Sequence, residues 1–257
     1  MAATVFYLDP LPPSAGDLAV LDGPEGRHAA TVRRIRTGEQ VVLADGQGGV
    51  AWGTVVTVGK DTLEVRVERR ESIAKPVPRV VVVQALPKSD RSELAVELMT
   101  EAGADEIIPW EAARCVARWQ GPKAHKNVER WQRVAASAAK QSRRAHVPLV
   151  HPLAASREVA SAIAATVAAS GAAVVLHEDA TEALAPVVHA VGDVRSILLI
   201  VGPEGGVSPD EAEQFTQAGA HPVRLGPTIL RTSTAAAVTL GALGVLTARW
   251  DNAPMRY

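Results

Sequence analysis

Short runs of β-branched residues alternate with turns over the first 70 positions of the chain. Glycine- and aspartate-containing stretches separate the runs, which is typical of short strands. One helix, residues 24–34, is predicted to interrupt them. The predicted strands are residues 4–8, 40–44, 50–58 and 62–67. This pattern predicts a small β-barrel over residues 1–72, an architecture that often binds oligonucleotides.

The pattern changes after residues 73–78, where two prolines fit neither a helix interior nor a central strand and predict a linker. Residues 79–86 form a nearly continuous apolar run, as expected for a parallel strand that is covered on both faces. Strands and helices then alternate, which predicts an α/β domain with a mostly parallel sheet over residues 79–257. The further predicted strands are residues 106–108, 148–151, 172–176, 196–201 and 222–225, and the predicted helices are residues 90–102, 127–144, 157–168, 181–190, 209–218 and 234–250.

Two of these helices carry more detailed expectations. In the first, Glu93 is placed to form a capping box with Asp90, and Leu94, Leu98 and Ala102 share one side. The last helix is apolar on nearly all sides, so it is predicted to be buried all round. Its many small residues suggest a subunit interface, and an internal core helix is the alternative.

The composition is ordinary for a globular protein, with 257 residues of which 47% are hydrophobic and 21% charged. No apolar run reaches the roughly 18 residues that span a bilayer, and the first residues do not resemble a signal peptide. A single cysteine, Cys115, excludes an intramolecular disulfide. We therefore expect a cytoplasmic protein, and no metal site is predicted.

The net charge of −1 hides a segregation of basic residues. From Arg114 to Arg144 there are nine basic residues and one acidic residue, Glu129. A second cluster, residues 27–36, contains four arginines and no acid. Clustered basic charge is typical of a surface that binds a polyanion, and a solvated helix face is the alternative explanation.

A glycine-rich loop, residues 202–206, follows a predicted strand. It matches neither the P-loop nor the dinucleotide-binding pattern of glycines. Ser208 is predicted to cap the next helix, whose acids Asp210 and Glu211 would repel a phosphate, as would Glu204. Because sheets of this kind bind ligands at the carboxyl ends of their strands, a neutral or cationic ligand is expected. A purely structural turn is the alternative.

A second loop, residues 225–234, also joins a predicted strand to a helix. Its apolar side chains Leu225, Ile229 and Leu230 are placed to clamp a flat base, while backbone groups nearby read its edge. The two loops together predict one ligand pocket.

These loops resemble the signature of the bacterial 16S ribosomal RNA uridine-N3 methyltransferases of the SPOUT superfamily. The similar stretches are Leu-Ile-Val-Gly-Pro-Glu-Gly-Gly at residues 199–206 and Leu-Gly-Pro-Thr-Ile-Leu-Arg-Thr at residues 225–232. The resemblance covers nearly the whole chain. Its other matches are residues 84–88, 106–109, 130–131 and 138–142, and in the first domain His28, residues 32–36, Gly38 and residues 45–46.

The resemblance implies a homodimer with an N-terminal PUA-like β-barrel for RNA and a C-terminal α/β domain with a trefoil knot. It also implies S-adenosyl-L-methionine as cofactor, which agrees with a loop unsuited to phosphate because this ligand is a sulfonium cation. The implied activity is methylation of N3 of a uridine in small-subunit ribosomal RNA, free or within the 30S subunit. The implied cofactor contacts are Leu176, Gly202, Glu204, Gly205, Leu225, Gly226, Ile229, Leu230, Thr232 and Ser233.

Arg231 is the candidate catalytic residue. Negative charge spreads onto the uracil oxygens as N3 loses its proton, and a fixed cation can stabilise that charge. A contact with a phosphate or a loop carbonyl is the alternative role. The residues expected to contact RNA are Arg33, Arg34, Arg36, Lys88, Arg143 and Arg144.

The chain departs from the family pattern at Ser233, where family members usually have a glutamate. This departure favours an alternative function, that of a non-catalytic RNA-binding or ribosome-assembly factor on the same fold. Binding of S-adenosylmethionine discriminates between the two hypotheses.

Overall fold

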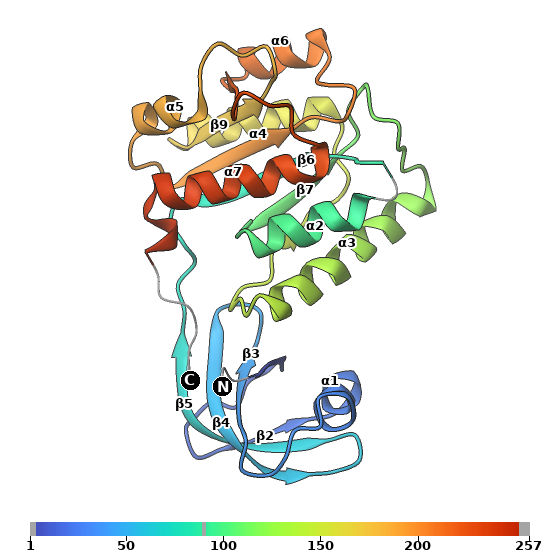
Figure 1. The fold of residues 1–257 in the computed structure, drawn as a ribbon, viewed down its shortest axis with the longest axis vertical. Coiled ribbons are helices and arrows are strands. Elements are labelled where there is room, and N and C mark those ends of the chain that lie inside the picture. The colour runs from blue at the N-terminus through green and yellow to red at the C-terminus, as the bar shows by residue number, and fades with distance from the viewer. Residues whose placement is uncertain (1–3, 89–90, 252–257) are drawn as a thin grey trace. The chain divides into compact units, whose positions relative to one another are not determined.

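A computed structural model describes residues 4–88 and 91–251 of the chain. The chain folds into two compact units, each with a hydrophobic core of its own (Figure 1). The first unit contains the residues up to Lys75 together with Ala139–Val147. The second contains Pro76–Ala138 and the described residues from Pro148 to Asp251.

The first unit is built on a five-stranded sheet with the strand order β1-β3-β4-β5-β2. β1 runs parallel to β3, and the other neighbours are antiparallel. Alternate side chains such as Val41, Leu43 and Val65 are buried in its core, which explains why these short runs form strands. The strands are β1 Thr4–Tyr7, β2 Leu18–Leu21, β3 Gln40–Ala44, β4 Gly49–Val58 and β5 Leu63–Ser72.

The helix predicted over residues 24–34 is shorter in the structure and changes its hydrogen bonding. α1 spans Gly23–Arg27, and a π-helical turn follows at His28–Val32. In this turn the Arg33 amide donates to the carbonyl five residues earlier, at 2.8 Å. Arg34 then adopts a φ of +55°, which ends the helical segment.

Gly48 lies where the barrel backbone turns closely against another segment of the first unit. Its φ is +107°, and a Cβ atom at this position would lie 2.5 Å from His146 Cε1 and 2.7 Å from the Ile73 carbonyl oxygen. Neither the backbone conformation nor the space therefore admits a side chain.

We expect Gly48→Ala to lower the free energy of unfolding by about 1–3 kcal/mol, because the alanine is strained and also displaces the Ile73 backbone. Urea unfolding followed by circular dichroism measures the change. Gly16→Ala is the matched control, since Gly16 has a φ of +94° but open space around it. Equal destabilisation by both variants would contradict a contribution from the close approach.

The second unit contains a six-stranded sheet with the order β11-β9-β10-β6-β7-β8, and all its recorded pairings are parallel. The predicted α/β domain with a parallel sheet is confirmed. The strands are β6 Arg79–Ala85, β7 Glu106–Trp110, β8 Leu149–Val150, β9 Ala172–Leu176, β10 Ser196–Val201 and β11 His221–Val223. The helices are α2 Ser92–Glu101, α3 Pro122–Gln141, α4 Ser156–Ala168, α5 Leu184–Val191, α6 Pro209–Gln217 and α7 Thr232–Leu246, with a final 3₁₀ turn at Ala248–Trp250.

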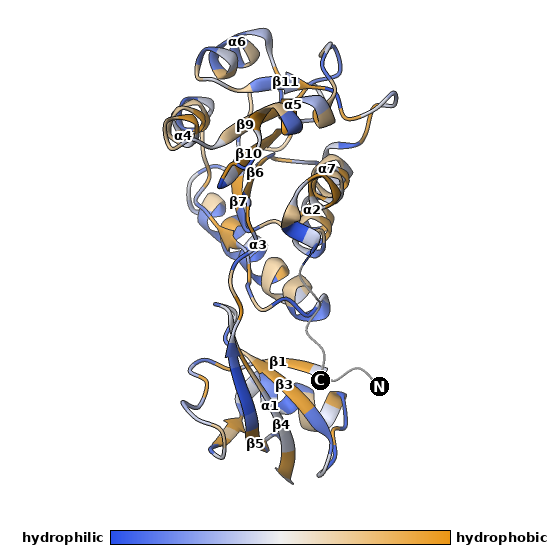
Figure 2. Ribbon diagram, turned by 90° about the vertical axis from the view of Figure 1, so that its left-hand side faces the viewer, coloured by the Kyte–Doolittle hydropathy of each residue, from blue (hydrophilic) through white to orange (hydrophobic). Residues whose placement is uncertain are grey.

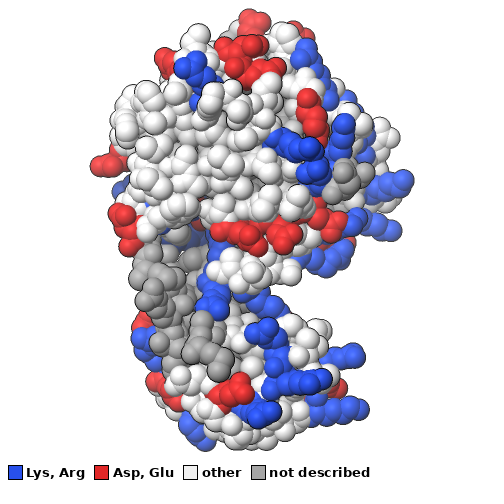
Figure 3. All heavy atoms as spheres, viewed as in Figure 1, with Lys and Arg blue, Asp and Glu red and all other residues white. Residues whose placement is uncertain are grey.

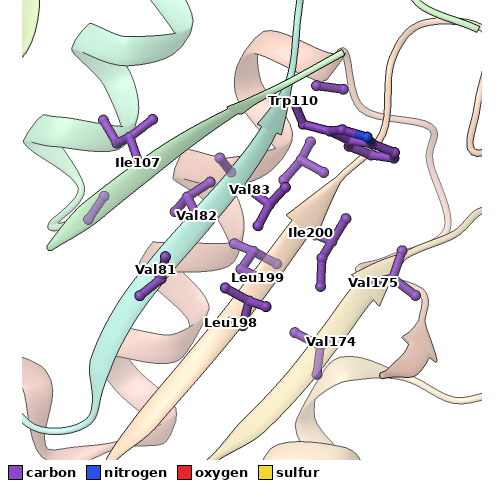
Figure 4. Close-up of a cluster of buried hydrophobic side chains, with 14 of the residues drawn as sticks. Val81, Val82, Val83, Ile107, Trp110, Val174, Val175, Leu198, Leu199 and Ile200 are labelled. Carbon is purple, nitrogen blue, oxygen red and sulfur yellow. The ribbon is translucent and has the colours of Figure 1, made fainter. Parts of the chain in front are cut away.

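Helices cover both faces of this sheet. Figure 2 shows α2 and α7 on one side of the apolar strands and α4 on the other. The side chains between the layers are buried and aliphatic, with Trp110 at the end of β7 (Figure 4). Burial on both faces explains why the strands read as continuous apolar runs in the sequence.

In the first helix of this unit, the side that Leu94 and Leu98 were predicted to share is not the buried side. Asp90 lies outside the described residues, and α2 begins at Ser92 without a side-chain cap. The buried residues of α2 are Ala95, Val96, Met99 and Thr100, whereas Leu94 is exposed. The helix packs against α7, a contact that the local periodicity does not indicate.

The last helix, α7, is not buried all round. One face is buried, while Val238 is 48% and Val245 is 75% exposed. Part of the small-residue surface packs against Trp250 of the same chain, since a Cβ atom on Gly244 would collide with that indole ring. The final turn thus folds back onto α7.

Arg249 anchors this final turn in the interior of the second unit. Its guanidinium lies 2.8 Å from the Asp105 carboxylate, and the two side chains are 5% and 2% exposed. The same guanidinium donates to the carbonyls of Gly103 and Pro78. A charge this deeply buried is tolerated because it is paired and hydrogen-bonded.

Candidate functional site

A pocket of about 790 Å³ lies at the carboxyl ends of β9, β10 and β11. The loop after each of these parallel strands contributes to its wall, as the topology of α/β sheets leads one to expect. The structure brings together nine of the ten predicted cofactor residues and the candidate catalytic residue. Those in the wall are Leu176, Gly202, Glu204, Gly205, Leu225, Gly226, Ile229, Leu230, Arg231 and Thr232.

The glycine-rich loop after β10 is held by two contacts with other segments. The Glu204 carboxylate accepts a hydrogen bond from the Lys88 amide at 3.2 Å. The Arg114 side chain donates to the Gly205 carbonyl at 3.2 Å. A Cβ atom on Gly205 would lie 3.1 Å from Arg114 Cβ, so a glycine permits this close approach.

The second loop presents both anchored and exposed side chains. Leu225 and Leu230 pack partly against the core, whereas Ile229 is 82% exposed. Arg231 is exposed and precedes the first turn of α7, where its carbonyl accepts a hydrogen bond from the Thr234 hydroxyl. The loop thus offers an apolar wall next to a solvated guanidinium.

Ser233 is the predicted cofactor residue that does not line the pocket. It is 1% exposed within α7, and its hydroxyl has no hydrogen-bond partner among residues 4–88 and 91–251. Ser233 therefore lies behind the pocket wall.

Comparisons with known proteins find matches to both parts of the chain. An RNA methyltransferase domain matches residues 74–244, and an RNA methyltransferase PUA domain matches residues 21–68. The chain is 55% identical over 251 residues to the ribosomal RNA small subunit methyltransferase E of Mycobacterium tuberculosis. The aligned region covers 98% of this chain and 95% of the relative. The chain belongs to the ribosomal RNA small subunit methyltransferase E family. The resemblance inferred from the two loops is confirmed.

Solved structures of this methyltransferase family share the fold. A methyltransferase from Legionella pneumophila in complex with bound SAM matches with a TM-score of 0.82 at 26% identity, covering 95% of this chain and 98% of that one. The ribosomal RNA small subunit methyltransferase E of Neisseria gonorrhoeae bound to S-adenosylmethionine matches with a TM-score of 0.81 at 28% identity and the same coverage. A PUA-like barrel followed by a SPOUT-type parallel-sheet domain is therefore confirmed.

The acids at the start of α6 do not face the pocket of this methyltransferase, contrary to the prediction. Ser208 caps the helix as expected, and its hydroxyl accepts from the Glu211 amide at 3.3 Å. Glu211 itself is buried, and neither it nor Asp210 lines the pocket. The pocket carboxylates are instead Glu178, Asp179 and Glu204.

Glu211 joins three segments through its carboxylate. It accepts hydrogen bonds from the Ala113 amide at 2.7 Å and the Ser156 hydroxyl at 2.6 Å, and from Ser208 at the start of α6. Burial by itself raises the pKa of Glu211, but hydrogen bonds from Ser156, Ala113 and Ser208 outweigh it and leave the pKa below its ordinary value of 4.5.

We expect Glu211→Gln to destabilise the protein at about pH 7 and to matter progressively less in acid. Because the folded-state pKa is depressed, the stabilisation by the carboxylate is present above the unfolded-state pKa and is lost as the pH falls through the folded-state pKa. Urea unfolding of both proteins at about pH 7 and about pH 3.5 measures the difference. A difference that is the same at both pH values would contradict this role.

Several residues of the pocket wall in this family member are not among those predicted from the sequence. His177, Glu178 and Asp179 follow β9, Arg224 follows β11, and Arg114 follows β7. Their common signal is position, since each comes soon after a strand that ends at the same edge of the sheet.

Five of the six predicted RNA contacts lie in the first unit, the PUA-like part of the methyltransferase. Arg33, Arg34 and Arg36 are exposed after the π-helical turn. Arg143 and Arg144 belong to the segment Ala139–Val147. The sixth, Lys88, lies in the second unit.

Contacts with β1 link the two groups of arginines. Arg33 Nη2 donates to Thr4 Oγ1 at 3.4 Å, and the Tyr7 hydroxyl donates to the Arg144 carbonyl at 3.1 Å. Burial raises the pKa of Tyr7 to about 12, so this hydroxyl keeps its proton. The structure thus gathers basic residues from distant parts of the sequence around one strand.

The described residues of this methyltransferase include no group of three or more His, Cys, Asp or Glu side chains placed to hold a metal ion. Among the same residues, no helix is both long and apolar enough to cross a membrane.

Proposed function

We propose that the chain transfers a methyl group from S-adenosylmethionine to N3 of a uridine in 16S ribosomal RNA. The observation that carries this proposal is the pocket formed by the two glycine-containing loops at the carboxyl edge of the sheet. Family relatives are named as small-subunit ribosomal RNA methyltransferases, and family structures hold S-adenosylmethionine.

The pocket suits this cofactor in size and chemistry. Its volume of about 790 Å³ lies within the range of roughly 300–1,000 Å³ for sites that enclose a drug-sized ligand. Leu176, Leu225 and Leu230 offer apolar surface for an adenine ring. The carboxylates of Glu178, Asp179 and Glu204 favour hydroxyl donors and positive charge over a polyphosphate.

The proposed cofactor contacts are the residues that line this pocket, several of them through backbone groups. They are Leu176, Gly202, Glu204, Gly205, Leu225, Gly226, Ile229, Leu230 and Thr232. Ser233 is proposed to act indirectly, by supporting the first turn of α7 from behind.

In the proposed reaction N3 would lose its proton to water and bond to the methyl carbon, while the bond between that carbon and the sulfonium sulfur would break and S-adenosylhomocysteine would leave. S-adenosylmethionine, when bound, supplies an electrophilic methyl group. The protein contributes position, because the two loops fix where the donor and the base meet. Arg231 contributes charge, since its guanidinium at the pocket wall can stabilise the negative charge on the uracil oxygens as the proton leaves.

The basic residues of the first unit are proposed to hold the RNA backbone. Arg33, Arg34, Arg36, Arg143 and Arg144 lie on a PUA-like barrel, and phosphate contacts of this kind position RNA without reading its sequence. The target uridine has to be unstacked to reach the pocket. Action on a ribosomal substrate supports a cytoplasmic location for the enzyme.

A homodimer is proposed on the exposed face of α7. Figure 3 shows a broad uncharged surface where α7 lies in Figure 1, and Val238 and Val245 are exposed on that helix. Exposed apolar patches of this kind mark interaction surfaces. Light scattering at micromolar concentration tests this proposal, and a monomer would contradict it.

The trefoil knot of the family is likewise proposed for this domain.

The decisive experiment offers methyl-tritiated S-adenosylmethionine and 30S subunits to the purified protein. Digestion of the RNA to nucleosides is expected to release labelled N3-methyluridine. Calorimetry with S-adenosylmethionine alone accompanies the assay. Cofactor binding without any labelled nucleoside would contradict the substrate, and no cofactor binding would support a non-catalytic RNA-binding factor.

A further inference from the structure

A second pocket, of about 540 Å³, lies beside the proposed cofactor pocket within the second unit. Its wall includes Lys88, Val116, Arg118, Trp119 and Arg130, and we call it the Trp119 pocket. Two segments that follow β6 and β7 form much of it. It therefore lies at the same carboxyl edge of the sheet as the cofactor pocket, over the neighbouring strands.

The two pockets are joined by direct contacts. The Lys88 amide donates to Glu204 of the cofactor pocket at 3.2 Å. Arg114 lines the cofactor pocket and bonds to the Gly205 carbonyl, and the chain runs from it directly to Val116 and Trp119. The walls of the two pockets are therefore in direct contact.

Trp119 is held in a fixed orientation. Its ring packs edge to face on Trp131, with centroids 5.1 Å apart and an interplanar angle of 84°. Trp131 is buried, and its indole nitrogen donates to Ser92 Oγ at 2.9 Å. The Trp119 amide donates to Glu111 at 3.0 Å. A half-buried tryptophan held in this way is a preorganised stacking surface.

The charges around this ring suit a phosphate. Arg118 pairs with Glu111, and Arg130 pairs with Glu93. The Lys88 side chain is exposed and has no acidic partner within residues 4–88 and 91–251. Lys and Arg side chains gather on this side of the second unit, where α2 and α3 lie (Figures 1 and 3).

We propose that the Trp119 pocket binds one nucleotide of the RNA substrate next to the target uridine, with its base stacked on Trp119 and its phosphate at Lys88. Aromatic stacking and cationic phosphate contacts are how proteins hold unpaired RNA nucleotides. Stacking needs no particular base, so the pocket orders the strand and brings the target over the cofactor pocket. This proposal rests on the proposed function.

The test compares Trp119→Ala and Trp119→Phe with the wild type in methyl transfer to 30S subunits. Trp119→Ala is expected to raise KM for the subunits about 10-fold, as lost stacking predicts, and to leave S-adenosylmethionine affinity within about twofold by calorimetry. Trp119→Phe keeps an aromatic ring and is expected to stay within about threefold of wild type. An unchanged KM for Trp119→Ala would overturn the proposal.

Lys88→Ala provides a second measurement that does not depend on the tryptophan. It is expected to reduce the slope of log affinity for 16S ribosomal RNA against log salt by about 0.7–0.9, the effect of one phosphate contact. Arg195→Ala is the charge-matched control, because Arg195 is exposed and precedes β10 at the opposite edge of the sheet. If Trp119→Ala fails to fold, equal slopes for Lys88→Ala and Arg195→Ala overturn the proposal.

RNA binding separates this proposal from the proposed function. The wild type could transfer no methyl group to 30S subunits and still bind 16S ribosomal RNA. In that case the salt dependence of RNA binding by Lys88→Ala and the loss of RNA affinity in Trp119→Ala still test the role of the Trp119 pocket. If the wild type is fully active and neither variant changes in KM, RNA affinity or salt dependence, the role proposed for the Trp119 pocket is overturned while the proposed function stands.

Discussion

Replacing Arg231 by alanine is expected to lower kcat for methyl transfer by about 10²–10³-fold, the range observed when a single group that stabilises developing negative charge is removed. The guanidinium is exposed at the wall of the proposed cofactor pocket and forms no recorded ion pair with a described residue. Its removal therefore leaves the fold intact and affects the charge at the reacting base. Single-turnover methyl transfer to 30S subunits measures the change.

The control is Arg231→Lys, which keeps a positive charge and is expected to recover part of the lost rate. S-adenosylmethionine affinity, measured by calorimetry, is expected to stay within about threefold in both variants, because a catalytic contribution is made mainly in the transition state. A variant that loses cofactor binding in parallel with kcat would instead indicate that Arg231 shapes the pocket.

Replacing Arg249 by alanine is expected to lower the free energy of unfolding by about 3–5 kcal/mol. The substitution removes the cation that pairs with the Asp105 carboxylate, whose side chain is 2% exposed. It also removes the donor to the Gly103 carbonyl at 2.5 Å. A buried charge without its counterion is far more costly than the loss of an exposed ion pair. Urea unfolding followed by circular dichroism measures the effect.

Arg79→Ala is the matched control, since its guanidinium lies 2.8 Å from Glu106 but its side chain is 49% exposed. It is expected to cost about 1 kcal/mol or less. A double variant, Arg249→Met with Asp105→Leu, is expected to be more stable than Arg249→Ala because no unpaired charge remains. Equal effects of Arg249→Ala and Arg79→Ala would show that burial of the pair is unimportant.

The central strands are the part of the fold that sequence predicts best. β3, β9 and β10 begin and end at the predicted residues, because an apolar run buried on both faces has few alternative boundaries. β2 is not predicted, since Leu18 and Val20 on its outer face are exposed and only Ala19 and Leu21 are buried. A strand this short has too little pattern to recognise.

The pocket wall was predictable where it follows the glycine-containing loops, and was missed where long-range contacts determine it. Glu211 illustrates the limit, because local sequence indicates a helix-capping acid, whereas its carboxylate also binds Ala113 and Ser156, which lie 98 and 55 residues away. Trp119 was missed for the same reason. Its orientation comes from Trp131 on α3, and only the fold brings that partner next to it.

The final turn at Arg249 has a consequence for biosynthesis. Arg249 bonds to the carbonyl of Pro78, 171 residues earlier and almost at the start of the second unit, and to Asp105, 144 residues earlier. Contacts of such high sequence separation form late and slow folding. The strands of the first unit are complete in the early part of the chain, so they can pair while synthesis continues. The sheet that holds the proposed cofactor pocket gains this buried partner only after Arg249 has left the ribosome.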